Sequence, residues 1–419
     1  MSVPASGPLG TVAEAAPRLT IVIPALDEAE AIGETIQRCL DARADIVAAG
    51  GASGVDVIVV SDGSTDGTAE VARGFRDVEV IEFRQNQGYG AAIKAGIRRA
   101  SGELVGFLDA DGTCDPAFFA QLCRAVHLGD ADIALGSRMS KDSRMPKVRA
   151  IGNGLYALFL SVLSNQRITD TASGMRVMRR SRLPDLGPLP DGLHYTPAMS
   201  ARAVLKGQRV VEIPMTYAER IGRSKLRVSR DGWRFLRALL DGVLLFRPER
   251  LFLIVALLAL AAATLLSLNP IEFYVANRRL EEWMIYRFVV AFLLGSAGIL
   301  SLGAAAVVSR MSELVLSRGG RGFWMSLLVG WFRGMRVTVL VGLLVLASAA
   351  LVWPGVVEYA RSGHVTIHWS RVMVAAFGLL VAFQAVLTRV LLRITTLWIE
   401  FAMSGERPSG AGESGVLPS

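Results

Sequence analysis

The sequence predicts a doubly wound α/β domain followed by an all-α transmembrane domain of four helices. Two observations carry this prediction. In the first half of the 419-residue chain, short apolar runs typical of buried strands alternate with stretches typical of helices. After about residue 250, uncharged stretches reach the length that crosses a lipid bilayer. The chain is therefore expected to have one water-soluble part and one membrane-embedded part.

Six runs rich in Val, Ile and Leu show little polar alternation, as strands buried on both faces do. They are residues 19–24, 55–60, 78–83, 104–108, 133–136 and 210–214. Helices are predicted between them, at residues 28–40, 66–75, 91–100 and 116–127. Asp66 can cap the second helix, and Asp115 before Pro116 opens the fourth. The result is a mainly parallel sheet, in which ligands bind beyond the carboxyl ends of the strands.

Four later stretches are long enough to span a hydrocarbon core of ~30 Å. They are residues 251–268, 288–309, 337–357 and 372–388. A buried core helix is the alternative for any one of them, above all for the last, which contains Gln384. We expect a soluble domain over 18–228, an amphipathic juxtamembrane helix over 229–250 and a transmembrane domain over 251–400. The ends, 1–17 and 401–419, are expected to be flexible.

Charge and targeting signals place the soluble domain in the cytosol. Residues 1–17 lack the basic start and the apolar centre of a signal peptide. Arginines concentrate before the first span and between the second and third spans, which the positive-inside rule assigns to the cytoplasm. They are Arg247, Arg250, Arg310, Arg318, Arg321, Arg333 and Arg336. We expect a multi-pass integral protein of the plasma (inner) membrane.

Composition excludes several classes of partner. The net charge is +8, but no basic run is interleaved with aromatics, so nucleic acid is not a predicted partner. Cys39, Cys114 and Cys123 lack the spacing of a disulfide framework or zinc site and are typical of buried thiols. Trp233 and nearby apolar residues recur at helical spacing opposite Arg234, Arg237 and Asp241, which favours a helix on the membrane surface. Packing on the protein is the alternative, as it is for a similar segment with Trp324, Trp331 and Phe332.

Carboxylates gather directly after three predicted strands. The first strand runs into Asp27 and Glu28, the second into Asp62, and the fourth into Asp109-Ala110-Asp111. Asp109 and Asp111 point the same way if the chain is still extended, so both can offer oxygens to one hard cation. A capping or turn role is the alternative for this pair, and a self-bonded turn is the alternative for Asp62.

The order of these motifs resembles glycosyltransferase family 2, and more narrowly the polyprenyl-phosphate glycosyltransferases of the dolichol-phosphate mannose synthase type. The motifs are Pro24-x-x-Asp27-Glu28, Asp62-Gly-Ser-x-Asp66-Gly-Thr68, Asn86-x-Gly88, Asp109-x-Asp111, Gly136-Ser137-Arg138, Asp170-x-x-Ser173-Gly174-x-Arg176 and Arg220-x-Gly222-x-Ser224-Lys225. The resemblance implies a Rossmann-like, nucleotide-sugar-binding domain of the GT-A type in a cell-envelope enzyme. It also implies inverting transfer of one sugar from a UDP- or GDP-linked donor to polyprenyl phosphate.

The resemblance implies a metal-held donor. Asp109 and Asp111 would bind Mg²⁺ or Mn²⁺ that bridges the diphosphate and offsets the charge on the leaving group. The family often supplies a Gln two positions after the second Asp, whereas this chain has Thr113, which leaves a third protein ligand open. Lys94 is a further candidate for the diphosphate. The nucleotide-binding candidates are Pro24, Ala25, Asp27, Glu28, Asp62, Lys94, Asp109 and Ala110.

The acceptor side is expected to be cationic, because a lipid phosphate carries a charge of about −1.5 to −2. The candidates are Arg138, Ser173, Arg176, Arg220 and Lys225, with Arg138 joining Asp109 and Asp111 as catalytic residues. A deprotonated phosphate needs positioning rather than a general base. For a sugar hydroxyl acceptor, Asp170 would be the base. Its alternative is to hold a turn or to pair with Arg176.

Two other functions stay open. A processive polysaccharide synthase on the same fold would need a Gln-x-x-Arg-Trp motif, which the sequence lacks. A nucleotide-binding membrane scaffold without turnover is disfavoured, because the predicted metal and phosphate residues are present together. The sequence does not determine the donor base and sugar, the lipid length, or whether the chain forms a homo-oligomer.

Overall fold

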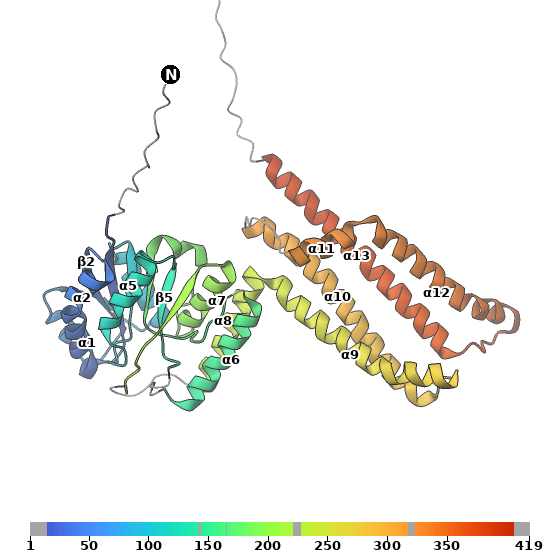
Figure 1. Cartoon of the computed structure of the whole chain (residues 1–419), viewed down its shortest axis with the longest axis horizontal. Coiled ribbons are helices and arrows are strands. Elements are labelled where there is room, and N and C mark those ends of the chain that lie inside the picture. The colour runs from blue at the N-terminus through green and yellow to red at the C-terminus, as the bar shows by residue number, and fades with distance from the viewer. Residues whose placement is uncertain are drawn as a thin grey trace, which may run out of the picture. The chain divides into compact units, whose positions relative to one another are not determined.

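The structure is a computed structural model that describes residues 15–140, 143, 145–164, 166–220, 228–316 and 323–405. The chain divides between Phe246 and Arg247 into an α/β unit and an all-helical unit. Figure 1 labels the elements of both units along the chain. The predicted flexible ends lie largely outside the described residues.

The α/β unit contains one seven-stranded sheet with the order β3-β2-β1-β4-β6-β5-β7. The strands are β1 (Arg18–Ala25), β2 (Gly54–Asp62), β3 (Val78–Phe83), β4 (Leu104–Phe107), β5 (Ile133–Ser137), β6 (Arg176–Arg179) and β7 (Val210–Pro214). The six predicted strands are parallel, whereas β6 runs antiparallel to its neighbours β4 and β5. The prediction missed β6, because two of its four residues are arginines.

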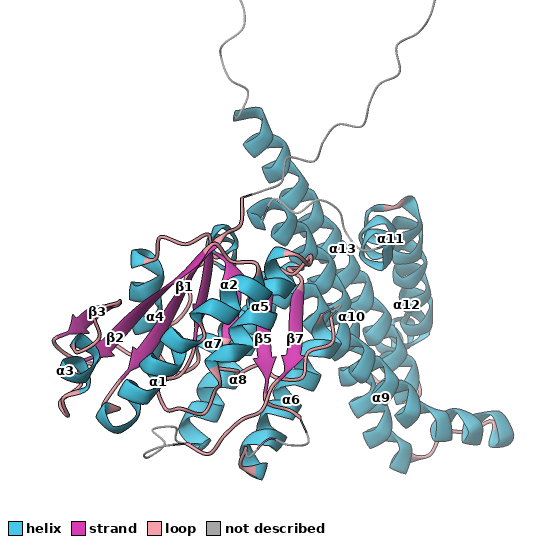
Figure 2. Cartoon of the chain, turned by 60° about the vertical axis from the view of Figure 1, so that its left-hand side comes forward, coloured by secondary structure: helices cyan, strands magenta, loops and turns pink. Residues whose placement is uncertain are grey.

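Helices cover both faces of the sheet, which Figure 2 shows with the strands in magenta. Ile21 and Ile23 of β1 face a core shared with α1, α2 and α5, while Val22 faces a second core with α4 and α7. Burial of both faces explains the continuous apolar runs, since each buried large apolar side chain contributes about 1.5–3 kcal/mol. The helices of this unit are α1 (Ala29–Asp41), α2 (Arg43–Gly50), α3 (Thr68–Arg73), α4 (Tyr89–Arg99), η1 (Pro116–Phe118), α5 (Phe119–His127), α6 (Lys147–Leu163), η2 (Arg180–Arg182), η3 (Pro184–Leu186), α7 (Tyr195–Lys206) and α8 (Val228–Phe246).

The all-helical unit has a long apolar helix at each of the four stretches predicted to span a membrane. Its elements are α9 (Pro248–Asn277), η4 (Glu282–Met284), α10 (Ile285–Leu316), α11 (Phe323–Arg333), α12 (Met335–Ser362) and α13 (Trp369–Gly405). Four of these helices are long and apolar enough to cross a membrane. Gln384 of α13 is buried and donates to Ser296 Oγ of α10 at 2.9 Å, so the polar residue of the fourth span joins two helices.

The three predicted interface anchors on the short helix α11 differ in their exposure. Trp324 and Trp331 are exposed, as expected of residues at a membrane surface. Phe332 is instead buried in a cluster with Ala306 and Leu392. The prediction is wrong for this residue, because its ring packs inside the helical unit.

Candidate active site

A cavity of about 510 Å³ lies in the α/β unit, beyond the carboxyl ends of the parallel strands. We call the carboxylates Glu28, Asp62, Asp109 and Asp111 its acidic wall. We call the arginines Arg138, Arg149, Arg230 and Arg234 its basic wall. Of the other predicted residues, Pro24, Ala25, Ala110 and Arg220 also line it.

The paired aspartates lie just beyond the end of β4, after Leu108. Asp109 accepts a hydrogen bond from the Tyr89 hydroxyl at 2.7 Å. Asp111 is 4% exposed, and its Oδ1 accepts from the Thr113 hydroxyl at 2.6 Å. Burial and then the neighbouring charge of Asp111 raise the pKa of Asp109 to about 6. Two close, partly desolvated carboxylates of this kind are a favourable environment for a cation.

A glycine lets Asp109 approach the loop that precedes β6. A Cβ atom added to Gly174 would lie 2.1 Å from Asp109 Oδ2. No side chain fits at that distance, so Gly174 of the Asp170-x-x-Ser173-Gly174 motif is needed for its lack of a side chain. Asp109 is therefore held between the Tyr89 hydroxyl on one side and the Gly174 backbone on the other.

The acidic wall suits a divalent cation that is held mainly by its substrate. Among the described residues, no group of three or more His, Cys, Asp or Glu side chains could hold a metal. Asp109 and Asp111 supply two carboxylates, and Thr113 donates its hydroxyl to Asp111. Mg²⁺ is commonly bound by one or two carboxylates, with water and substrate phosphates completing its shell. The residues present therefore fit Mg²⁺, and Mn²⁺ shares its preference for oxygen ligands.

Asp62 and Asp27 hold neighbouring loops in place. Asp62 accepts from the backbone amides of Gln87 at 2.7 Å and Gly88 at 2.9 Å. Burial raises the pKa of Asp62. The predicted alternative for Asp62 was a turn that it closes by its own hydrogen bonds. Its hydrogen bonds instead hold the loop before α4, and Asp62 also lines the cavity. Asp27 does not line the cavity; it accepts from the Thr65 amide at 2.8 Å.

Besides Asp27, three further predicted site residues do not line the cavity. Lys94 donates to the Leu189 carbonyl at 2.8 Å and pairs with Asp191 at 2.5 Å. Arg176 is fully buried, where its guanidinium donates to backbone carbonyls of the loop before β6. Ser173 is also buried and donates to the Gly136 carbonyl at 2.6 Å. Lys225 lies outside the described residues, so Arg138 and Arg220 remain from the predicted acceptor set.

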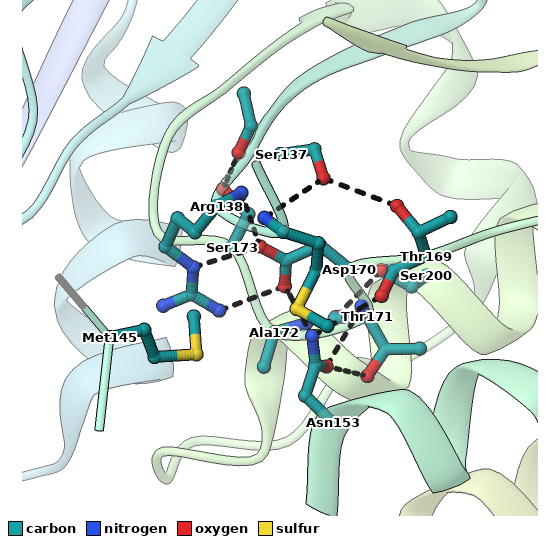
Figure 3. Close-up of polar contacts among 12 residues, drawn as sticks. Ser137, Arg138, Met145, Asn153, Thr169, Asp170, Thr171, Ala172, Ser173 and Ser200 are labelled. Atoms are coloured by element: carbon teal, nitrogen blue, oxygen red, sulfur yellow. Dashed lines mark hydrogen bonds and ion pairs between the residues drawn. The ribbon is translucent and has the colours of Figure 1, made fainter. Parts of the chain in front are cut away.

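Asp170 fixes the orientation of Arg138, as Figure 3 shows. Two guanidinium nitrogens of Arg138 each lie 2.8 Å from an Asp170 oxygen, and Asn153 donates to the same carboxylate at 3.1 Å. Burial raises the pKa of Asp170, but the charge and hydrogen bonds of Arg138 outweigh it and hold that pKa below its usual range. Asp170 is 0% exposed, so it is not placed to act as a base on an acceptor. The salt bridge forms with Arg138 rather than with Arg176.

Helices α6 and α8 complete the cavity with residues that were not predicted to belong to the site. Arg149 and Tyr156 come from α6, while Arg230, Arg234 and Phe235 come from α8. The buried Asp231 lies 3.7 Å from Arg230 and 3.6 Å from Arg234.

Tyr156 joins the two helices, since its hydroxyl donates to the Gly232 carbonyl at 2.7 Å. Its ring also packs edge-on against Phe235.

The outer face of α6 carries a stripe of exposed apolar side chains, with relative exposures of 62–65%. We call it the α6 stripe, and it consists of Val148, Ile151, Leu155, Leu158 and Val162. Another face of the same helix, with Arg149, Asn153 and Tyr156, lines the cavity, and Val148 at the start of the stripe lines it as well. The alternating spacing of three and four residues is a sequence signal that could have indicated this helix, which was not predicted.

Comparisons with known proteins agree with these features. Residues 20–187 match the family model described as glycosyl transferase family 2. The low-salt glycan biosynthesis hexosyltransferase Agl6 of Haloferax volcanii is 31% identical over 61% of this chain, and the chain spans 62% of that protein.

Two further relatives are covered almost throughout. A dolichyl-phosphate hexose transferase of Haloferax volcanii is 30% identical over 50% of this chain and 86% of its own length. An undecaprenyl-phosphate mannosyltransferase of Micrococcus luteus is 30% identical over 50% of this chain and 87% of its own length.

Proposed function

Because this chain belongs to glycosyltransferase family 2, we propose that it transfers one sugar from a nucleotide sugar to a polyprenyl phosphate. Two relatives are named for polyprenyl-phosphate acceptors, which supports a lipid-linked product. The observation that carries the proposal is the cavity itself, in which an acidic wall and a basic wall line the same space. The first suits a metal-bound diphosphate, and the second suits an anionic head group.

The acidic wall would receive the donor. Asp109 and Asp111 would hold Mg²⁺ or Mn²⁺, which when bound neutralises the charge that develops on the departing diphosphate. Tyr89 and Thr113 orient the two carboxylates by donating hydrogen bonds to them. Glu28 lines the cavity beside them and can accept from the hydroxyls or ring nitrogens of a nucleoside. The proposed donor is a UDP- or GDP-linked sugar.

The basic wall would receive the acceptor phosphate. Arg138 is held rigidly by Asp170, so its guanidinium is already oriented when an anion arrives. Arg149, Arg230 and Arg234 add positive charge from α6 and α8.

The α6 stripe suits a lipid environment, because five exposed apolar side chains on one helix are costly in water. We therefore assign this face of the α/β unit to the cytoplasmic surface of the membrane.

The proposed reaction is a single inverting displacement. An oxygen of the acceptor phosphate forms a bond to the anomeric carbon of the sugar, while the bond from that carbon to the diphosphate oxygen breaks. The electron pair of the broken bond leaves with the nucleoside diphosphate. No proton is transferred, since a phosphate monoester with a pKa near 6 is largely deprotonated at neutral pH. The enclosure of Asp170 agrees with a reaction that uses no base.

The test uses the full chain purified in detergent with Mn²⁺ or Mg²⁺, a short polyprenyl phosphate, and UDP- and GDP-sugars. We expect release of nucleoside diphosphate that depends on the lipid, together with a lipid carrying one sugar by mass spectrometry. Release that ignores the lipid, or a product with many sugars, would contradict the proposal. The second of these outcomes would instead indicate a processive synthase.

A further inference from the structure

Arg220 contacts two carboxylates of the acidic wall at once. Its guanidinium lies 3.1 Å from Asp111 Oδ2 and also forms an ion pair with Glu28. The side chains of Asp111 and Glu28 are 6% and 11% exposed, so both are largely shielded from water. A shielded carboxylate requires a nearby cation or hydrogen-bond donors, and Arg220 supplies that charge.

The contact lies where a metal ligand is needed. Oδ1 of Asp111 already accepts from the backbone amide and the hydroxyl of Thr113, at 3.2 and 2.6 Å. The remaining oxygen, Oδ2, is the one that Arg220 contacts. A divalent ion shared by Asp109 and Asp111 would therefore meet the Arg220 guanidinium at close range. Two cations at such a distance repel each other strongly in a site of low dielectric.

We propose that Arg220 is a competing counter-ion: it occupies Asp111 until a metal-bound donor displaces it, and only then becomes available to an acceptor phosphate. The first half concerns this chain's own residues and the metal. The second half rests on the proposed function. Together they give an order of binding, in which the metal-bound donor enters before the acceptor. Without ligands, the Arg220 guanidinium would pair with Asp111 and Glu28. With the metal-bound donor in place, it would bind the acceptor phosphate.

The first half is tested by Mn²⁺ binding without any donor. Free Mn²⁺ is measured by electron paramagnetic resonance during titration of the full chain in detergent. Arg220→Ala and Arg220→Gln should each bind Mn²⁺ about tenfold more tightly than the natural chain, because a charge-assisted contact no longer competes for Asp111. Arg234→Ala is the matched control: it removes another cavity arginine, one that pairs with Asp231, and should leave Mn²⁺ affinity within about twofold.

Mn²⁺ affinity that is unchanged or weaker in both Arg220 variants, with folding intact by thermal melting, would overturn the inference. The second half is tested by binding of a short polyprenyl phosphate with and without Mn²⁺ plus UDP or GDP. The natural chain should bind the lipid more tightly when metal and nucleotide are present, and Arg220→Gln should lose this increase. An increase that survives in Arg220→Gln would overturn the ordered binding.

The two proposals can fail separately. Tighter Mn²⁺ binding in the variants, with no sugar transfer by the natural chain, would refute the function and leave the counter-ion role intact. Sugar transfer by the natural chain, with unchanged Mn²⁺ affinity in the variants, would refute the counter-ion role and leave the proposed function intact.

Discussion

The two walls of the cavity are built in opposite ways. The carboxylates of the acidic wall stand at strand ends, and neutral donors such as Tyr89 and Thr113 orient Asp109 and Asp111. In the basic wall, the buried Asp170 orients Arg138, and the buried Asp231 lies beside Arg230 and Arg234. Apart from Arg220, which pairs with Asp111 and Glu28, the donors that orient the acidic wall are neutral, so part of its negative charge remains available for a cation. The acids beside these arginines offset part of their positive charge. The basic wall therefore contributes guanidinium groups in fixed orientations more than it contributes net charge.

The largest expected effect is on the acidic wall. Asp111→Ala removes one of the two proposed metal ligands, so metal-dependent release of nucleoside diphosphate should fall about a thousandfold. Asp115→Ala, an acid of the same loop whose side chain caps η1, should keep most of the activity. If Asp111→Ala kept full metal-dependent release of nucleoside diphosphate, Asp111 would not be a metal ligand, and the acidic wall would lose its proposed role.

Removing the charge of Asp170, the buried acid that orients Arg138, should lower the stability of the α/β unit. Asp170→Asn leaves the Arg138 guanidinium buried without its counter-charge, which should cost about 3–5 kcal/mol in the free energy of unfolding of the α/β unit. The control is Asp130→Asn, whose exposed pair with Arg209 should be worth less than about 1 kcal/mol. Chemical denaturation in detergent measures both variants.

The pH dependence of that loss has a defined sign. The pKa of Asp170 is lowered in the folded protein, so its contribution is complete above the unfolded carboxyl pKa of about 4 and disappears as pH falls through the folded value. The difference between the natural chain and Asp170→Asn should therefore be constant from about pH 5 to 8 and shrink in acid. A difference that grew in acid would be inconsistent with the pairing.

A smaller effect is expected from a substitution beside Asp109, which should lower kcat without changing the KM for the lipid acceptor. Gly174→Ala must push Asp109 from its place, so kcat should fall about tenfold to a hundredfold while the KM for the lipid stays unchanged. Gly154→Ala is a matched control, because a Cβ atom there meets nothing within 4 Å. Equal losses in the two variants would mean that the close approach at Gly174 has no role.

The smallest effect concerns the joint between α6 and α8. Tyr156→Phe removes the hydrogen bond to the Gly232 carbonyl, which is worth about 1 kcal/mol. We expect the KM for the lipid to rise a few-fold while the KM for the nucleotide sugar stays constant. A change confined to the nucleotide sugar would place this joint on the donor side.

The acidic wall could be predicted from sequence because local pattern determines it. A buried apolar run followed by acids already places Asp62, Asp109 and Asp111 at one edge of the sheet. The partners of those acids could not be predicted in this way. Tyr89 is 20 positions from Asp109, and nothing in the local pattern indicates that the two side chains meet.

The basic wall could be predicted only in part. Arg138 was identified by its motif, but its partner Asp170 is 32 positions away. Helix α6 was missed because apolar side chains lie on both its exposed and its buried face, where Leu160 and Leu163 join Asn153, so no polar face marks it. Arg176 misled the prediction, since a guanidinium that donates to backbone carbonyls inside a core resembles a ligand-binding one in sequence.

The α6 stripe also has a consequence for handling the protein. It belongs to the α/β unit and remains when the four long apolar helices are removed. A fragment that ends at Phe246 would expose Leu155 and its four neighbours in the stripe to buffer, and such fragments self-associate or adsorb to surfaces. Truncation alone would thus give a detergent-requiring fragment, and polar substitutions along the stripe would be needed to make it freely soluble.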